Sequence, residues 1–398
     1  MTGAQNGAAA PGGQDQRAFT LGVMGGGQLG RMFVHAAQVH GYRVVVLEPD
    51  AASPAGGLAE QQLKAAYLDG EALTQLTQSC HAVTTEFENV PASALRMLAE
   101  HCKVAPAADA VEVCQNRVRE KACFAQAGVP CTPYARLASA ADLVNPALLE
   151  LLPGILKTAS MGYDGKGQAR VSTLADLQAA WRAMGEVECV LEQRLDLRTE
   201  VSVILARRGN GDVVNLPVQQ NLHRDGILAV TQVPAPDVDA AVQQAAVERA
   251  QQLAQSLSYV GVLCVEFFVL QDGSLVANEM APRPHNSGHY SIDACDVSQF
   301  DLQVRTLTDL PLVQPRLHSA AVMLNLLGDL WFDGPSALPR QPDWACVLAL
   351  PGARLHLYGK HEPRRGRKMG HLTLTASTPE QARQQALVAA QRLGLPSF

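Results

Sequence analysis

The stretch CVEFFVLQDGSLVANEM, residues 264–280, contains two apolar, strand-like runs joined by an Asp-Gly step. Asp-Gly between two such runs is the strongest short-range signal for a hairpin with a two-residue loop. With Asp272 and Gly273 as that loop, Glu266 of the first run stands directly opposite Glu279 of the second. Asn278 points to the other face of an ideal strand, so a ligand contact from its side chain requires a local irregularity.

The two facing glutamates predict a cation site. Opposed carboxylates in a sheet repel one another, which costs stability unless one is protonated or a cation lies between them. A hard divalent ion with oxygen ligands, Mg²⁺ in an ATP-dependent enzyme, resolves the conflict. The alternative is a solvated pair on an exposed sheet face, although charges are rarely unpaired within apolar strands.

The segment that follows, APRPHNSGH at 281–289, is broken by prolines and rich in hydrogen-bond donors. We expect a loop whose side chains converge on a polar ligand. Arg283 has the planar fork that suits bicarbonate or a carboxylate. His285 and His289 fit hydrogen-bonded structural roles equally well.

A lysine and a glycine-rich loop precede the hairpin. Residues 155–157, Ile-Leu-Lys, read as the end of a strand, and MGYDGKGQ follows at 161–168. The amides of such a loop can fold over a polyphosphate, although the spacing is not that of a Walker A loop. A flexible surface hairpin is the alternative. The lysines, aspartate and glutamine of this region favour a nucleotide.

The N-terminal region begins with a strand at 19–24, the turn GGGQLG at 25–30, a helical segment to Val39 and a strand at 43–47. This β-α-β pattern, continued to about residue 106, predicts a parallel sheet covered by helices on both faces. The glycine motif alone leaves three readings open. They are a dinucleotide site with Glu48 at a ribose hydroxyl, a site for another phosphate, and close packing of helix against strand.

The remaining pattern predicts a helix at 112–128, strands within 154–171, 190–205, 213–233 and 262–280, and one amphipathic helix at 238–256. A last unit begins near His318. Its basic cluster comprises Lys360, Arg364, Arg365, Arg367 and Lys368. Such a cluster is either a solvated face or a site for a substrate phosphate or carboxylate.

Composition excludes several classes of protein. The 398 residues, 47% hydrophobic, can form two or three domains with buried cores. A net charge of −6 gives no general attraction for nucleic acid or anionic membranes, and no apolar run has the length of a membrane span. Nine cysteines without a Cys-x-x-Cys pair predict reduced thiols in a cytoplasmic protein. Residues 1–18 predict a disordered tail and not a signal peptide.

These elements in this order resemble the ATP-grasp superfamily, and in detail the family of N5-carboxyaminoimidazole ribonucleotide synthetases. The resemblance rests on GVMGGGQLGRM, TEFENVP, GYDGKGQ, EVSVI, NEMAPRPHNSGHY and GRKMGH. It implies an α/β and α+β fold. The implied units are the tail at 1–18, a Rossmann-like (pre-ATP-grasp) parallel-sheet domain at 19–115, an ATP-grasp domain with a lid subdomain at 116–317, and a small β-rich C-terminal domain at 318–398.

The resemblance also implies an activity: ATP- and bicarbonate-dependent carboxylation of 5-aminoimidazole ribonucleotide in purine biosynthesis. Bicarbonate would attack the γ-phosphate of Mg·ATP, and carboxyphosphate, or CO₂ released from it, would carboxylate the amine. ATP is the implied cosubstrate, Mg²⁺ the cofactor and a homodimer the assembly. The competing hypotheses are an oxidoreductase that uses the glycine motif, a different ATP-grasp ligase, and a catalytically inactive nucleotide-binding regulator.

Site residues follow from the same resemblance. The implied ATP site comprises Arg117, Lys157, Gly162, Tyr163, Asp164, Gly165, Lys166, Gly167, Gln168, Glu192, Gln193, Arg194, Leu195, Glu200, His223, Asn278 and Glu279. The implied metal ligands are Glu266 and Glu279. The implied ribonucleotide or bicarbonate site comprises Gly27, Gln28, Leu29, Glu86, Asn286, Lys360 and Arg367. The implied catalytic residues are Asp164, Arg283, Lys360 and Arg367, with Asp164 near the reacting amine. The run at 360–365 matches the family only loosely, and Thr85 stands where an aromatic residue is frequent.

Overall fold

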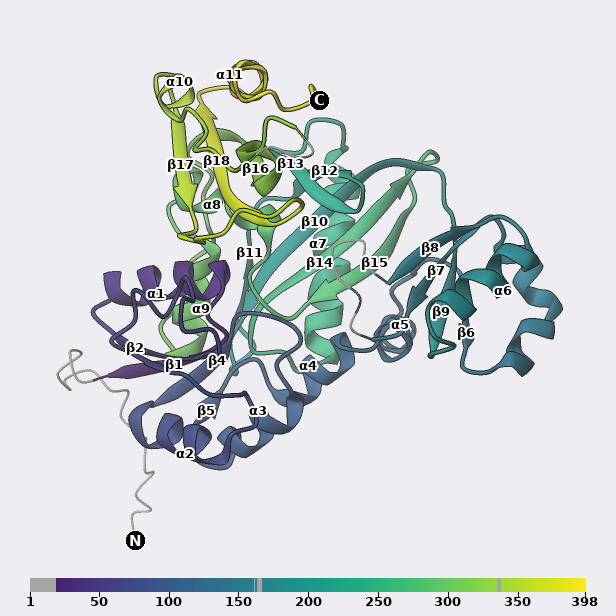
Figure 1. The fold of residues 1–398 in the computed structure, drawn as a ribbon, viewed down its shortest axis with the longest axis horizontal. Coiled ribbons are helices and arrows are strands. Elements are labelled where there is room, and N and C mark those ends of the chain that lie inside the picture. Colours follow the sequence, from purple (N-terminus) through teal and green to yellow (C-terminus); the bar gives the residue numbers. More distant parts are fainter. Residues whose placement is uncertain (1–18, 161, 163–166, 335–337) are drawn as a thin grey trace, which may run out of the picture.

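The computed structural model describes residues 19–160, 162, 167–334 and 338–398. The tail predicted at 1–18 lies outside the described residues. The described chain forms three β-sheets with helices packed against them (Figure 1). This mixed architecture, one parallel sheet and two antiparallel ones, confirms the predicted fold class.

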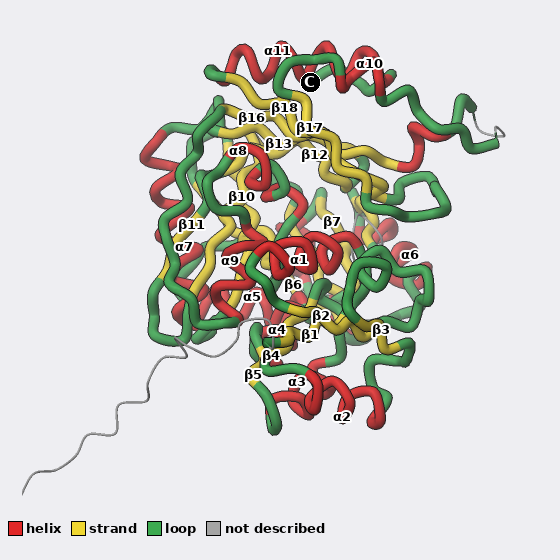
Figure 2. The backbone as a smooth tube through the Cα atoms, turned by 90° about the vertical axis from the view of Figure 1, so that its left-hand side faces the viewer, coloured by secondary structure: helices red, strands yellow, loops and turns green. Residues whose placement is uncertain are grey.

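The N-terminal unit is a parallel sheet, as predicted, and its strands lie in the order β3-β2-β1-β4-β5. Helix α1 contributes Phe33 to the core on one face, and α2 contributes Leu76 to the core on the other. Helix α9 (Gln299–Leu307), from much later in the chain, packs beside α1 on the first of these faces (Figure 2). The elements of this unit are β1 (Thr20–Met24), α1 (Gln28–Val39), β2 (Arg43–Leu47), β3 (Gln61–Leu63), α2 (Gly70–Ser79), β4 (Ala82–Thr85), α3 (Ala92–Ala99) and β5 (Lys103–Val104).

The helix predicted at 112–128 is in fact two helices, α4 (Ala108–Cys114) and α5 (Arg117–Gln126). The side chain of Asn116 accepts hydrogen bonds from the amides of Val118 and Arg119 and so caps α5. A side-chain oxygen that caps a new helix competes with continuation of the previous one. The break places Arg117 in the first turn of α5, where its side chain reaches the acidic hairpin.

A small antiparallel sheet in the order β6-β9-β7-β8, with α6 against it, forms the lid subdomain at the right of Figure 1. Its core includes Leu156, Trp181 and Leu191. The elements are β6 (Tyr134–Leu137), β7 (Gly154–Thr158), β8 (Gln168–Val171), α6 (Leu174–Ala183) and β9 (Cys189–Gln193), with 3-10 turns at Ala140–Val144 and Pro146–Leu151.

The largest sheet runs β15-β14-β10-β12-β13-β16-β18-β17, with β11 beside β10. The C-terminal unit continues this sheet, because β16 pairs with β13. The elements are β10 (Leu197–Arg207), β11 (Val213–Asn215), β12 (Gln219–Arg224), β13 (Ile227–Val233), α7 (Ala240–Ser256), β14 (Gly261–Leu270), β15 (Leu275–Ala281), α8 (Ser291–Ala294), α9 (Gln299–Leu307), β16 (Ala320–Leu327), α10 (Ala345–Leu348), β17 (Ala353–Leu357), β18 (Lys368–Ala376) and α11 (Pro379–Leu393), with 3-10 turns at Asn286–Gly288 and Gly328–Trp331. Within the described part of the chain, no helix is both long and apolar enough to cross a membrane.

The hairpin of β14 and β15 has a different loop from the one predicted. The amide of Leu270 donates to the carbonyl of Ser274, and Gly273 has a φ of 81°. A turn followed by a left-handed glycine gives a three-residue loop. The predicted two-residue loop is therefore wrong, and the strands start one residue out of the expected register.

A bulge at Asn278 cancels that shift. Phe267 pairs with Ala277, and the next pair is Glu266 with Glu279, which leaves Asn278 without a partner on β14. The predicted facing of the two glutamates is therefore confirmed. A bulge locally re-aims a side chain, so it provides the irregularity that a ligand contact from Asn278 requires.

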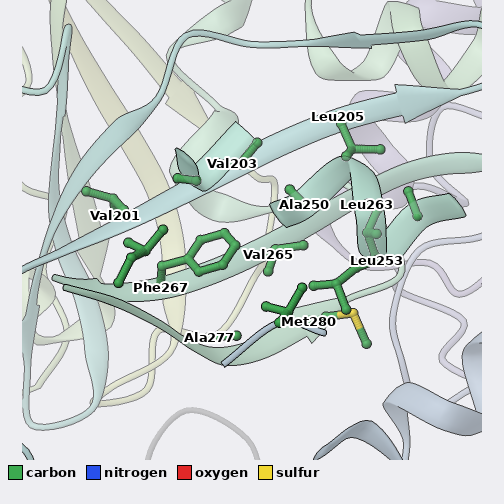
Figure 3. Packing of buried hydrophobic residues seen from close by; sticks show 14 of the residues in the cluster. Val201, Val203, Leu205, Ala250, Leu253, Leu263, Val265, Phe267, Ala277 and Met280 are labelled. Atoms are coloured by element: carbon green, nitrogen blue, oxygen red, sulfur yellow. The ribbon is translucent and has the colours of Figure 1, made fainter. Parts of the chain in front are cut away.

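Alternation along β14 divides its side chains between the core and the site. Val265 and Phe267 pack under α7 against Leu253, in the cluster drawn in Figure 3. Glu266 lies between them in sequence and points to the other face, since successive strand residues alternate. The core thus fixes the strand that presents the acidic residue.

We expect Phe267→Ala to lower the free energy of unfolding by about 3–5 kcal/mol, because Phe267 is fully buried and its loss leaves a cavity. Urea denaturation measures this change. Val39→Ala, at a side chain that is 83% exposed, is the control and should stay within about 0.5 kcal/mol of the parent. Equal midpoints for the two variants would contradict the assigned core.

Candidate functional site

The acidic pair lies where three units of the fold meet. Glu279 pairs with Arg117 at 3.0 Å, and Glu266 Oε1 lies 3.3 Å from Nε2 of His285. Burial raises the pKa of Glu266, and Glu279 adds to the rise although His223 opposes it. Burial also favours the protonated form of Glu279, but Arg117 and then Lys157 outweigh it and hold its pKa below the usual value. The pair therefore carries its charge mainly on Glu279.

These residues fit a hard divalent cation. Glu266 and Glu279 offer carboxylate oxygens from directly paired positions. The buried Oδ1 of Asn278 has no hydrogen-bond partner among the described residues, so it is a further oxygen donor for a ligand. Cys264 also lies near Glu266 and His285. Burial holds the pKa of its thiol well above the usual value, which disfavours thiolate ligation.

A buried ionic triad lies beside the acidic pair. Glu192 on β9 forms an ion pair with Lys157 of β7 at 2.7 Å and another with Lys121 of α5 at 2.9 Å. The three side chains are between 1% and 11% exposed. Burial opposes ionisation of Glu192, but Lys157 and then Lys121 outweigh it and lower its pKa to about 2. The triad therefore carries one excess positive charge, which suits the phosphates of a nucleotide.

Sequence reasoning missed Lys121 and its neighbour Glu120. Glu120 is buried and accepts a hydrogen bond from the amide of Met280, next to Glu279. Burial raises the pKa of Glu120 to about 8, with Arg117 opposing the rise. A signal was available: Phe124 marks the buried face of α5, and residues three and four positions before it share that face.

The remaining residues of the implied ATP site lie around these groups where they are described. His223 on β12 pairs with Glu200 on β10 at 2.6 Å. Burial lowers the pKa of His223, but Glu200 and Glu266 outweigh it and raise it to about 9. The hinge, residues 192–195, leads from the end of β9 to β10. The carbonyl of Gly167 accepts a hydrogen bond from Thr158, beside Lys157, and Gln168 begins β8. Gly162 is described, whereas Tyr163, Asp164, Gly165 and Lys166 lie outside the described residues.

The first glycine motif is filled by carboxylates from its own domain. Glu86 accepts hydrogen bonds from the amides of Gly27 at 2.9 Å and Gly30 at 3.0 Å. Glu48 accepts one from Gly26 at 2.8 Å and another from the hydroxyl of Tyr67. Glu48 is thus engaged inside the domain, which disfavours the dinucleotide reading of the motif.

Close approach explains why these positions are glycine. A Cβ at Gly27 would lie 2.5 Å from the Glu86 carboxylate, and one at Gly26 would lie 2.5 Å from Ser53 Oγ. The amides order Glu86 and the start of α1. Gln28, the first residue of α1, is then presented outward to the C-terminal unit, while Leu29 is buried.

Some side chains of the loop after the hairpin already have ion-pair or hydrogen-bond partners within the protein, and others do not. Arg283 forms an ion pair with Glu88 of the N-terminal unit. Asn286 is buried, and neither side-chain atom finds a partner in the described part of the chain. His289 is buried and His285 is half-buried, and desolvation is the main cause of their pKa values, which lie well below the usual one. His289 hydrogen-bonds Gln299, which is the structural role that the sequence left open.

The basic segment divides into two parts. Arg364 pairs with Glu362, and Arg365 lies over the ring of Phe332. Lys360 instead donates to Gln28 Oε1 and to the carbonyl of Lys368, both at 2.7 Å. Arg367 donates to the carbonyl of Glu362. The structure therefore brings Lys360 to the glycine-motif helix and turns Arg364 and Arg365 toward partners in their own unit.

Three known domain families match successive parts of the chain. Residues 18–115 match the ribonucleotide synthetase preATP-grasp domain, 122–300 the ATP-grasp domain, and 321–385 the phosphoribosylaminoimidazole carboxylase C-terminal domain. Together these matches extend over most of the chain.

Relatives that match over most of the chain and similar solved structures point to the same family. The chain is 44% identical over 357 residues to the N5-carboxyaminoimidazole ribonucleotide synthase of Brucella melitensis, covering 89% of this chain and 95% of that protein. It is 39% identical to the Bacillus subtilis synthase, covering 89% and 90%. A synthase from Aspergillus clavatus, solved with ADP and 5-aminoimidazole ribonucleotide, superposes with a TM-score of 0.86 at 31% identity, covering 96% of this chain and all of that one. An ADP complex of another synthetase superposes with the same TM-score at 37% identity, covering 95% and 96%.

Proposed function

The chain belongs to the family of N5-carboxyaminoimidazole ribonucleotide synthases, and from that premise we propose how its own residues serve the reaction. It is an ATP-grasp ligase that carboxylates 5-aminoimidazole ribonucleotide at the expense of ATP, in purine biosynthesis. One observation carries the assignment of its site. The paired glutamates Glu266 and Glu279 lie beside two cationic groups, Arg117 and the Lys157–Glu192–Lys121 triad.

ATP occupies the space between the lid subdomain and the β14–β15 hairpin in this proposal. Lys157 and Arg117 face the phosphates of ATP. The hinge at residues 192–195 lies along the nucleobase of ATP. His223, held by Glu200, adds positive charge at the same face of the sheet. Phosphoryl transfer needs charge neutralisation and positioning more than a protein nucleophile, and this group of cations supplies both.

Mg²⁺ would be held by Glu266 and Glu279, with Asn278 beside them. The ion would neutralise charge that develops on the phosphates during transfer. Arg117 then orients Glu279, and the neutral ring of His285 orients Glu266 through its Nε2. The unpaired Oδ1 of Asn278 supports this assignment.

The ribonucleotide would lie between the glycine-motif helix and the C-terminal unit. Gln28 and Lys360 already meet there, and Glu86, Asn286 and Arg367 are the other residues that we assign to it. Bicarbonate would bind near Arg283, whose guanidinium is shared with Glu88. Bicarbonate attacks the γ-phosphate of ATP to give carboxyphosphate and ADP. The amine of the ribonucleotide then takes the carboxyl group from carboxyphosphate, or from CO₂ released from it, and inorganic phosphate leaves. In this proposal Asp164 takes the proton that the amine loses.

We propose that the protein is cytoplasmic. All nine cysteines are free, which suits the reducing cytoplasm.

We also propose a homodimer, on the basis of the family resemblance. Light scattering in solution tests this assembly. A monomer at assay concentrations would refute that assembly.

One assay separates this function from its competitors. We expect ADP release only when ATP, bicarbonate and 5-aminoimidazole ribonucleotide are all present, or release strongly stimulated by the ribonucleotide. A ligase with another acceptor would not respond to this ribonucleotide. An inactive nucleotide-binding regulator would bind ATP and release no ADP, and an oxidoreductase would require a nicotinamide.

A further inference from the structure

The strand that leads to Lys360 is the last one in its sheet. β17 pairs with β18 alone among the described strands, and Lys360 follows shortly after its end. One row of backbone groups on an edge strand has no partner strand. A side chain presented from such a strand needs support outside the sheet if it is to hold a ligand accurately.

His356 on β17 provides that support. Its Nε2 lies 2.8 Å from Oδ2 of Asp293, which belongs to α8 in the loop region after the acidic hairpin. The side chain of Asp293 is 11% exposed and that of His356 29% exposed. A partly buried, directional contact of this kind loses less to solvent screening than a surface pair does. It joins the C-terminal unit to the ATP-grasp unit.

The ring of His356 is also fixed from the side. It stacks on His371, its direct neighbour on β18, with centroids 4.4 Å apart and planes at 9°. His371 in turn makes a 3.0 Å hydrogen bond to the hydroxyl of the buried Tyr358. Asp293, His356 and His371 have ligand-like spacing. They do not suit a metal, however, because a single ion cannot lie in two nearly parallel ring planes.

The short path from His356 to Lys360 is closely packed against its surroundings. Tyr358 is buried, and Gly359 has a φ of 74°. A Cβ at Gly359 would lie 3.2 Å from the guanidinium of Arg31 on α1. Lys360 then meets Gln28 on the same helix. Because the path is short and closely packed, the position of the His356 ring determines where the chain presents Lys360 to α1.

We propose that the Asp293–His356 pair is a positioning contact that holds the end of β17, and with it Lys360, at the ribonucleotide site. The proposal rests on the role that the proposed function gives to Lys360. Neither Asp293 nor His356 is assigned to ATP, so loss of their contact should weaken binding of the ribonucleotide and leave binding of ATP unchanged.

Asp293→Ala and His356→Phe test the pair. Alanine removes the carboxylate that contacts the ring, and the phenyl ring keeps the stacking partner and loses the hydrogen bond. We expect the KM for 5-aminoimidazole ribonucleotide to rise about 10-fold or more, as for other residues that orient a ligand-binding group. The KM for ATP should stay within about 2-fold. His356→Gln, which keeps a donor for Asp293, should recover most of the loss. Equal increases in the two KM values, or no increase in either, would overturn the proposal.

Two controls distinguish failure of the positioning proposal from misfolding of a variant and from failure of the role assigned to Lys360. Thermal unfolding of each variant shows whether it folds, and the two His356 variants decide the matter if Asp293→Ala does not fold. Lys360→Ala is measured in parallel. If its KM for the ribonucleotide equals that of the parent, the assigned role of Lys360 fails. If Lys360→Ala raises that KM while Asp293→Ala and His356→Phe do not, the positioning proposal alone fails.

Discussion

Glu279→Gln is expected to lower ADP formation at least 100-fold, a loss of the size seen when one electrostatic contact to a transition state is removed. The substitution keeps the shape of the side chain and removes its charge. Arg117 then loses its ion-pair partner, and Glu266 is left as the only carboxylate at the proposed metal site. Initial rates of ADP release, titrated with Mg²⁺, give the measurement, and part of the activity should return at high Mg²⁺.

Glu248→Gln is the matched control, because it makes the same chemical change on the exposed side of α7. We expect it to retain the parent rate. ADP release by Glu279→Gln at the parent rate would refute the metal assignment. It would leave the fold and the family of the chain untouched.

The acidic hairpin shows how a prediction from sequence can be right for an incomplete reason. The apolar runs and the Asp-Gly step predict two strands and a turn, because these are local signals. The three-residue loop and the bulge at Asn278 each shift the register by one residue, and the shifts cancel. The predicted pairing of Glu266 with Glu279 could not reveal either shift, because this pair lies beyond both of them.

Other parts of the site depend on contacts between distant segments. Lys121 meets Glu192 through the packing of α5 against the lid subdomain, and no local pattern encodes that meeting. The glycine motif left three readings open because its sequence does not say what its amides bind. The fold supplies Glu86 from the end of β4, and that contact favours packing and positioning over a free phosphate loop.

The triad of Lys157, Glu192 and Lys121 leads to the second large effect. Glu192→Gln should lower the free energy of unfolding by about 3–5 kcal/mol, because it leaves two buried ammonium groups without a counter-charge. The same variant should lose measurable ATP binding, since Lys157 is no longer held. Urea denaturation and calorimetric titration with ATP measure the two effects.

The pH dependence of this loss has a definite sign. The pKa of Glu192 is lowered on folding to about 2, so its ionisation contributes stability at pH values above the pKa that it has in the unfolded chain. That contribution is lost as pH falls toward 2. The difference between the parent and Glu192→Gln should therefore be full at neutral pH and shrink progressively in acid. A difference that stays constant through this range would contradict the assigned charge state.

Removal of a lysine distinguishes charge imbalance from loss of packing. Lys121→Met keeps the one-to-one pair of Glu192 with Lys157, so it should cost less than Glu192→Gln. Combined with Glu192→Gln, it removes one of the two unbalanced cations, and the double variant should be more stable than Glu192→Gln alone. If the two losses simply add, the cost of Glu192→Gln reflects packing and not charge. A gain in the double variant means that the buried carboxylate is there to hold two lysines together, with their excess charge left for the nucleotide.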